Sequence, residues 1–112
     1  MIYLAAPFSH PDVTVRAARV EAATLAAAQL WDRGLTVYSP ITHGACIEAY
    51  LTGERSHDWW MRHCWPFLRR SDYMIVLDIE GWRESVGVTA EIKFCHSHGV
   101  KVVMHSERWG KR

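Results

Sequence analysis

Four short apolar runs recur along the chain, and residues that favour turns bound each of them. Segments of four to eight apolar residues between glycine, proline or polar positions are typical of buried strands. We therefore predict four strands, of which the third is the clearest. Their ranges are Ile2–Ala6, Leu35–Ser39, Asp72–Asp78 and Lys101–His105.

The segments between these strands carry the spacing of helices with one apolar face. The longest is the alanine-rich stretch Val13–Arg33, which Asp12 can cap at its start and Gly34 can end. A helix is also predicted over Asp58–Arg70, with a kink or a break at Pro66. The two remaining helices are predicted from Thr42 or His43 to Tyr50, and over Gly87–His98.

Strands that alternate with helices favour right-handed crossovers and a parallel sheet. We predict an α/β fold with three layers, similar to flavodoxin and Rossmann domains. Its sheet has about four strands in the order 2-1-3-4, with helices on both faces. Residues 1–106 form this single domain, and residues 107–112 form a polar tail. In such sheets the ligand site lies beyond the carboxyl ends of the strands, here between the first and third.

Composition narrows the possible partners. The 112 residues include 13 Lys and Arg against 12 Asp and Glu, a net charge of +1. A charge so close to zero predicts no nucleic-acid polymer and no membrane surface as partner, and no apolar segment is long enough to span a bilayer. The odd set Cys46, Cys64 and Cys95 indicates free thiols, so we expect a cytoplasmic protein.

The loop after the third predicted strand is the most informative of the three that leave carboxyl strand ends. Ser85 and Gly87 stand where a helix begins, so free N–H groups and the positive helix end can hold a phosphate or carboxylate. Glu91 follows Gly87 by one helical turn and shares its face. The commoner role of such residues is structural, with Ser85 as a helix cap and Glu91 as a first-turn acid.

Other kinds of site find less support. The chain lacks the glycine-rich dinucleotide motif, the phosphate-binding loop with its lysine, and the serine elbow of hydrolases. Cys95, His96 and His98 have spacings that do not converge on one ion, so no metal and no cofactor is expected. Tryptophans more often fill cores or contact a neighbouring subunit than stack on bases, and we expect this of Trp59, Trp60 and Trp65.

Three stretches together resemble a known family. They are the opening Ile2-Tyr-Leu-Ala-Ala-Pro-Phe8, the segment Ser71-Asp-Tyr-Met-Ile-Val-Leu-Asp78, and Gly81-Trp82-x-x-Ser85-x-Gly87-x-x-x-Glu91. They resemble the nucleoside 2-deoxyribosyltransferase-like superfamily, and within it the uncharacterised DUF1937 group. The resemblance covers nearly the whole chain, and its third stretch is the most specific.

This resemblance implies a role for several residues. In the superfamily, a glutamate at the position of Glu91 attacks the anomeric carbon of the sugar. Ser85 and Gly87 match positions that hold the 5′-phosphate of nucleoside monophosphates, and Tyr3 matches a tyrosine of the site. Members usually assemble as oligomers, so a dimer or tetramer is expected. Cys64 stands where some relatives carry an acid, which is a departure from the pattern.

Further candidates come from position alone. Asp78 ends the third predicted strand and is the first candidate to bind the base or sugar, so it joins Glu91 and Tyr3 in the expected catalytic set. The loops that face the expected cleft supply the remaining substrate-binding candidates. These are Pro7, Phe8, Ser9, Gly81 and Trp82.

The sequence thus predicts cleavage of the N-glycosidic bond of a nucleotide or nucleoside by hydrolysis or transfer. An adjacent carboxylate can stabilise or trap the oxocarbenium-like transition state of that reaction. Two alternatives remain open at this point. One is a non-catalytic nucleotide-binding module that uses the same cleft, and the other is an interaction protein whose tryptophans contact a neighbour.

Overall fold

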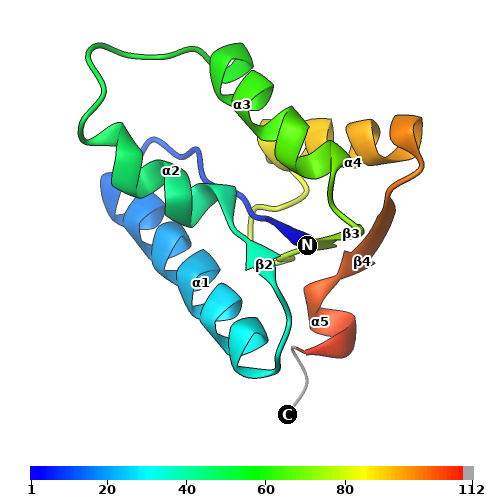
Figure 1. Ribbon diagram of the computed structural model, residues 1–112. Helices are drawn as coiled ribbons and strands as arrows, with labels where there is room; N and C mark the ends of the chain where they lie inside the picture. Colours follow the sequence, from blue (N-terminus) through cyan, green and yellow to red (C-terminus); the bar gives the residue numbers. More distant parts are fainter. Residues whose placement is uncertain (110–112) are drawn as a thin grey trace.

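The computed structural model describes residues 1–109 and contains one parallel sheet of four strands (Figure 1). The strands are β1 (Ile2–Ala5), β2 (Val37–Tyr38), β3 (Tyr73–Val76) and β4 (Lys101–Met104). Their order is β2-β1-β3-β4 and every pair is parallel. The predicted α/β class, strand order and parallel sheet are therefore confirmed.

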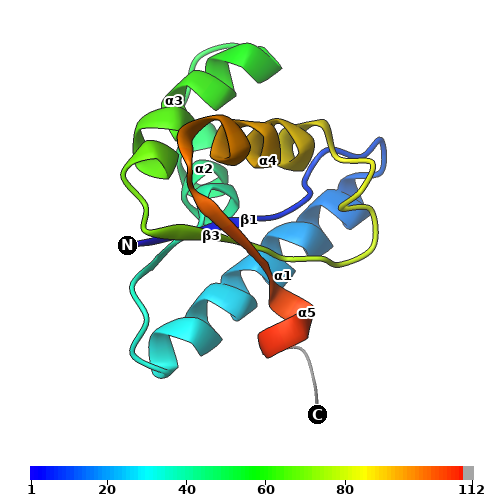
Figure 2. The same ribbon diagram turned by 90° about the vertical axis from the view of Figure 1, so that its right-hand side faces the viewer.

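Helices cover both faces of this sheet. Their bounds are α1 (Val13–Asp32), α2 (Pro40–Glu48), α3 (His57–Arg69), α4 (Val86–His98) and α5 (His105–Arg108). Figure 2 shows the sheet nearly edge-on, with α3 and α4 on one side and α1 on the other. This arrangement confirms the predicted three layers. Among the described residues, no helix is both long and apolar enough to cross a membrane.

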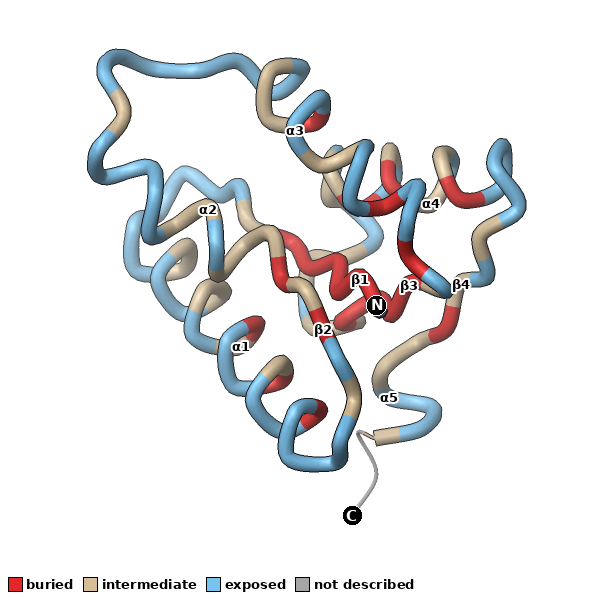
Figure 3. The backbone as a smooth tube through the Cα atoms, in the orientation of Figure 1, coloured by how far each residue is buried: buried red, intermediate tan, exposed pale blue. Residues whose placement is uncertain are grey.

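Alternation along the strands divides the core into two clusters. In β1, Ile2 and Leu4 join the cluster under α1, whereas Tyr3 and Ala5 join the cluster under α3 and α4. Successive strand side chains point to opposite faces, which explains this division. Figure 3 shows that buried backbone concentrates in the central strands. The strands are apolar on both faces because helices cover both.

Helix starts lie close to the predicted positions, with differences that caps explain. The α1 helix begins after Asp12, whose carboxylate accepts from the N–H of Thr14 at 2.8 Å, as predicted. The α2 helix begins at Pro40, two or three residues before the predicted start at Thr42 or His43. Ser39 caps it, and proline fits the first helical position because its missing N–H would have no partner there.

The third helix runs without interruption from His57 to Arg69, so Pro66 does not break it, and of the two predicted outcomes only a kink stays a prediction. Ser56 caps its start by accepting from the N–H of Trp59 at 3.1 Å, which moves the start one residue earlier than expected. Pro66 lies in the last part of the helix, where few further turns depend on the hydrogen bond that proline removes.

Two strand ends also differ from prediction. The β2 strand has only two paired residues instead of five, because Ser39 already serves as the cap of the next helix. The β4 strand ends at Met104, and α5 then begins at His105. Glu107 and Arg108, expected within a polar tail, belong to this helix, and Trp109 follows as its C-cap and packs against the core under α1. Residues 110–112 of that expected tail lie outside the described residues.

Candidate active site

The loop between β3 and α4 brings the main candidates to the carboxyl edge of the sheet. Gly81 has φ +94°, a left-handed conformation that favours glycine. The chain then turns back, since Trp82 donates its N–H to the carbonyl of Ile79 at 3.1 Å. Ser85 ends the turn as the cap of α4, and its hydroxyl oxygen accepts from the N–H of Val88 at 3.1 Å.

Ser85 therefore caps the helix, and this role leaves backbone N–H groups at the start of α4 free for a ligand. Val86 and Gly87 occupy the first two helical positions, where backbone N–H groups have no acceptor within a helix. Gly87 also leaves its surroundings open, because a Cβ at this position would contact only the Ser85 hydroxyl at 3.8 Å. The start of α4 thus has the two features from which the sequence predicted an anion site: free backbone N–H groups and a glycine that leaves space.

Glu91 lies farther along α4 and turns toward the sheet. It is a buried charged residue, with 5% of its surface exposed. Its Oε2 accepts a 2.5 Å hydrogen bond from the hydroxyl of Tyr3, which is fully buried on β1. The structure thus joins two of the three predicted catalytic residues across 88 positions of sequence.

Burial controls the electrostatics of this pair. Removal from water raises the pKa of Glu91 to about 7, although the hydrogen bond from Tyr3 acts in the opposite direction. Burial, with the nearby Glu91 carboxylate as a second cause, raises the pKa of Tyr3 well above its usual value. Tyr3 therefore remains a neutral donor, and Glu91 changes its charge near neutral pH. A group with these properties suits proton transfer or nucleophilic attack.

Two further side chains enclose the Tyr3–Glu91 pair. Cys64 on α3 packs against the cluster that contains Tyr3, and burial raises the pKa of its thiol. Tyr38 lies 5.9 Å from Tyr3 between ring centroids, and burial raises its pKa to about 12. Sequence reasoning noted Cys64 only as a departure and did not select Tyr38. Its position at the end of β2, beside Tyr3 in a parallel pair, is the signal that could have identified it.

An open cleft of about 530 Å³ borders the start of α4. The loop after β1 and the loop after β3 form its walls, and α1 contributes its base. The residues that line it are Ser9, His10, Pro11, Val15, Arg19, Glu80, Gly81, Glu84 and Ser85. Three predicted binding residues, Ser9, Gly81 and Ser85, therefore share one cleft. Glu91 and Tyr3 lie beneath the surface and do not line it.

The other predicted binding residues have different surroundings. Pro7 is fully buried, and Phe8 is half-buried where the chain leaves β1. Trp82 packs on the apolar cluster under α3 and α4, and the guanidinium of Arg83 lies 5.2 Å from its ring centroid. These contacts give Trp82 a packing role at the edge of the site.

Asp78 lies at the carboxyl end of the sheet as expected, but its carboxylate already has partners. Oδ1 accepts from the N–H of Ser106 at 3.0 Å, and Oδ2 accepts from its hydroxyl at 2.5 Å. Partial burial acts to raise the pKa of Asp78, yet the hydrogen bonds from Ser106 outweigh it and lower the value. Asp78 thus connects the end of β3 to α5, on the side of the sheet opposite Glu91.

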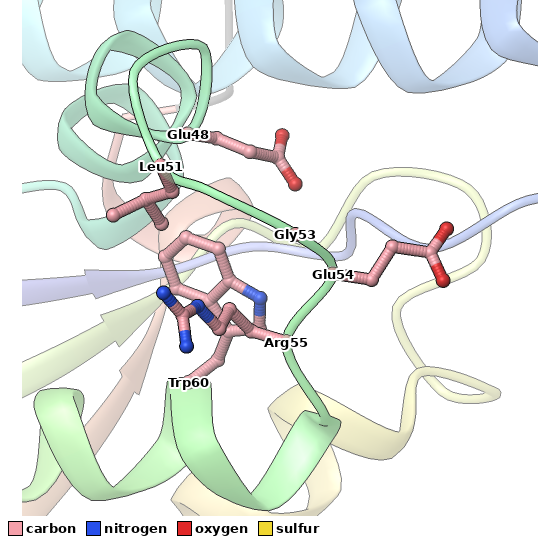
Figure 4. A pocket seen from close by; sticks show the side chains of 6 residues that line it. All are labelled: Glu48, Leu51, Gly53, Glu54, Arg55 and Trp60. Atoms are coloured by element: carbon pink, nitrogen blue, oxygen red, sulfur yellow. The ribbon is translucent and has the colours of Figure 1, made fainter.

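A second cleft, of about 480 Å³, lies where the chain passes from α2 to α3 (Figure 4). Its side chains include the ring of Trp60, the guanidinium of Arg55 and the carboxylates of Glu48 and Glu54. In Figure 4 the two carboxylates point away from the Trp60 ring. This cleft was not predicted from the sequence.

The predicted packing of the tryptophans is seen within the chain. Trp65 stacks on Phe94 of α4 with ring centroids 4.6 Å apart, and Trp59 meets Trp60 edge-on at 5.0 Å. Cys95 is buried, with its sulfur 3.8 Å from that of Met74. Within residues 1–109, no group of three or more His, Cys, Asp or Glu side chains is arranged to hold a metal ion.

The fold and site define a small parallel α/β protein with a buried carboxylate on the helix that begins at the carboxyl edge of its sheet. The chain belongs to the DUF1937 family, a domain of unknown function, whose family model matches residues 1–107. A comparison with curated proteins finds no match.

Proposed function

We propose that the protein cleaves the N-glycosidic bond of a nucleoside 5′-monophosphate or nucleoside, with Glu91 as the nucleophile. The observation that carries this proposal is the pairing of a buried carboxylate with a tyrosine hydroxyl, beneath the helix start that lies at the carboxyl edge of the parallel sheet. The resemblance of the opening and of the Gly81 to Glu91 segment to the nucleoside 2-deoxyribosyltransferase-like superfamily supports the same reaction.

The chemistry uses few groups. A carboxylate oxygen of Glu91 bonds to the anomeric carbon as the bond to the base nitrogen breaks, and the electron pair leaves with the base. The base takes a proton from water. Water, which gives one proton to the hydroxide left by that transfer, then attacks the anomeric carbon of the glycosyl ester, releasing the Glu91 carboxylate and a free sugar hydroxyl. Two displacements at one carbon retain its configuration. If a second base replaces this water, the same intermediate gives transfer.

Tyr3 has a defined part in this scheme. Its hydroxyl donates to Oε2, so it orients the carboxylate and favours the charged form that attacks. The other carboxylate oxygen remains for the sugar carbon. Ser85 and the N–H groups at the start of α4 would hold the 5′-phosphate and so position the sugar. Positioning of this kind can lower a barrier by several kcal/mol.

The burial of Glu91 favours a second candidate function. Because the carboxylate is only 5% exposed and lies outside the cleft lining, a nucleotide could occupy the cleft without contacting it. The protein would then be a nucleotide-binding module, in which the Tyr3–Glu91 pair stabilises the fold. This candidate predicts saturable binding without release of free base.

A substrate panel with matched variants distinguishes the glycosidase from the nucleotide-binding module. Each ribonucleoside and deoxyribonucleoside, its 5′-monophosphate and common modified-base forms are incubated with the protein, and free base is measured by chromatography. Glu91→Gln keeps the shape of the side chain but removes the nucleophile, so it should lower base release by roughly a thousandfold or more. Ser106→Ala, away from the cleft, serves as the control. Base release at the wild-type rate by Glu91→Gln would exclude the proposed mechanism.

A further inference from the structure

Arg19 of α1 reaches both loops that border the 530 Å³ cleft. Its Nη1 donates to the carbonyl oxygen of Ser9 at 2.8 Å, and its Nη2 lies 3.5 Å from the carbonyl oxygen of Glu80. One side chain thus connects the loop after β1 to the loop after β3, at the edge where a parallel sheet binds its ligand.

Gly81 makes room for this guanidinium. A Cβ at position 81 would overlap Nη2 of Arg19 and would also lie close to its Cζ, at 3.2 Å. The backbone of Gly81 is itself left-handed, with φ +94°. The glycine therefore permits the turn and also leaves space for the guanidinium of Arg19 beside the loop.

No carboxylate of the described residues forms an ion pair with Arg19 within 4.0 Å. Across residues 1–109, the one ion pair within 4.0 Å joins the Met1 ammonium to Asp72, at the other end of the sheet. A guanidinium has five N–H donors in a planar fork, and carbonyl contacts leave its charge intact. Arg19 therefore presents a positive charge in a cleft that also contains the Ser85 hydroxyl.

From these observations we infer that Arg19 recognises the anionic end of the ligand, a phosphate monoester, and so determines selectivity for nucleotides over nucleosides. The inference rests on the proposed function for the identity of the rest of the ligand. The planar fork can donate two parallel hydrogen bonds to two oxygens of one phosphate, a fixed geometry that the ammonium of a lysine does not provide. Glu80 and Glu84 on the same rim would disfavour an anion placed away from Arg19.

Binding of inorganic phosphate tests the recognition directly. The protein is titrated with phosphate at constant ionic strength, and backbone amides are followed by NMR. We expect saturable shifts at Gly81 and at the start of α4, and a dissociation constant weakened about tenfold or more in Arg19→Gln. Arg16→Gln is the matched control, because Arg16 lies one turn earlier and contacts the carbonyls of His10 and Pro11 without lining the cleft.

Two more variants keep the test decisive if Arg19→Gln folds poorly. Arg19→Lys retains the charge and should bind phosphate more weakly than the wild type. Gly81→Ala retains the arginine but displaces its guanidinium, so it should also weaken binding. Phosphate affinity equal to the wild type in all three variants, or no saturable binding by the wild type, would overturn the inference.

Selectivity in turnover provides the second readout. The ratio of kcat/KM for a 5′-monophosphate to that for its nucleoside should fall about tenfold or more in Arg19→Gln, while turnover of the nucleoside changes little. An unchanged ratio would contradict the inference. Phosphate binding that depends on Arg19, without base release from any substrate, would instead contradict the proposed glycosidase activity. The inferred anion site at Arg19 would still be supported.

Discussion

The hydroxyl of Tyr3 donates a 2.5 Å hydrogen bond to Glu91, so the second residue of β1 holds a carboxylate on α4. Both groups are buried, with Tyr3 fully enclosed and Glu91 5% exposed. A buried carboxylate that keeps only one strong donor is costly to ionise, and a neighbouring donor offsets part of that cost. The pair is consequently sensitive to pH and to loss of either partner.

The first prediction concerns the pH dependence of stability. Glu91 binds its proton more tightly in the folded protein, because burial raises its pKa from 4.5 to about 7. Its contribution to stability is therefore fully present below about pH 4.5 and is lost as the pH rises through 7. Between these values the wild type should lose up to roughly 3 kcal/mol relative to Glu91→Gln, measured by urea unfolding across pH. Parallel pH profiles for the two proteins would contradict the raised pKa.

Activity should follow the opposite direction over the same range. The carboxylate is the nucleophilic form, so kcat/KM should rise with pH and level off above the pKa of Glu91, near 7. Initial rates of base release between pH 5 and pH 9 would show this, as approximate limits for a group with that pKa. A rate that declines across neutral pH would indicate that protonated Glu91 acts instead as an acid.

Tyr3→Phe should shift both the pH profile of stability and the pH profile of activity. The hydroxyl lowers the pKa of Glu91, so its removal should raise that pKa and shift the rise in activity to higher pH. It should also cost about 1–3 kcal/mol of unfolding free energy at high pH, because a buried carboxylate loses its donor. Tyr38→Phe is the matched control, since Tyr38 is a neighbouring tyrosine whose hydroxyl bonds to Nδ1 of His43 at 3.3 Å, whereas the hydrogen bond to Glu91 comes from Tyr3. Equal shifts in both variants would show that Tyr3 acts only by packing.

Substitutions at Ser85 can separate capping from ligand binding. Ser85→Ala removes the acceptor for the N–H of Val88 and should lower stability by about 1 kcal/mol. Ser85→Asp keeps a good cap and places a negative charge at the positive helix end, so stability should be retained. The same charge should repel phosphate and weaken its binding. Thermal unfolding and phosphate titration of both variants would show whether the two effects separate.

The contact between Asp78 and Ser106 defines a fifth test. We expect a double-mutant cycle with Asp78→Ala and Ser106→Ala to give a coupling energy of roughly 1 kcal/mol, because the carboxylate accepts the hydroxyl hydrogen bond. Ser106→Ala should leave base release close to the wild-type rate. A large loss of kcat in Ser106→Ala would instead indicate that Asp78 and Ser106 take part in the reaction.

The sheet was predictable from the sequence because its apolar runs and the glycines after its helices are local signals. Gly34 follows α1 as predicted, and Gly99 follows α4 in the same left-handed conformation. The length of β2 was not predictable in the same way. Leu35–Ser39 has the composition of a five-residue strand, but pairing with β1 and the cap of α2 leave only Val37 and Tyr38 in the ladder.

The site was predictable only where one segment carries several of its residues. Ser85, Gly87 and Glu91 lie on one helix, and their relation follows from helical spacing. The contacts of Arg19 were not predictable, because nothing in the sequence shows that its long side chain crosses to Ser9 and Glu80. Such contacts depend on how two loops approach each other in the folded chain.

The central position of β1 has a consequence for how the site is assembled during folding. Tyr3 pairs with Tyr38 on one side and with Met74 on the other, and Glu91 comes later still in the chain. A register slip of one residue would turn Leu4 toward Glu91 and the tyrosine toward α1. Intermediates that lack the second half of the sheet contain no assembled site. Gain of the proposed activity during refolding would therefore indicate that the strands have paired correctly. A chain that has only collapsed would be compact but would lack this activity.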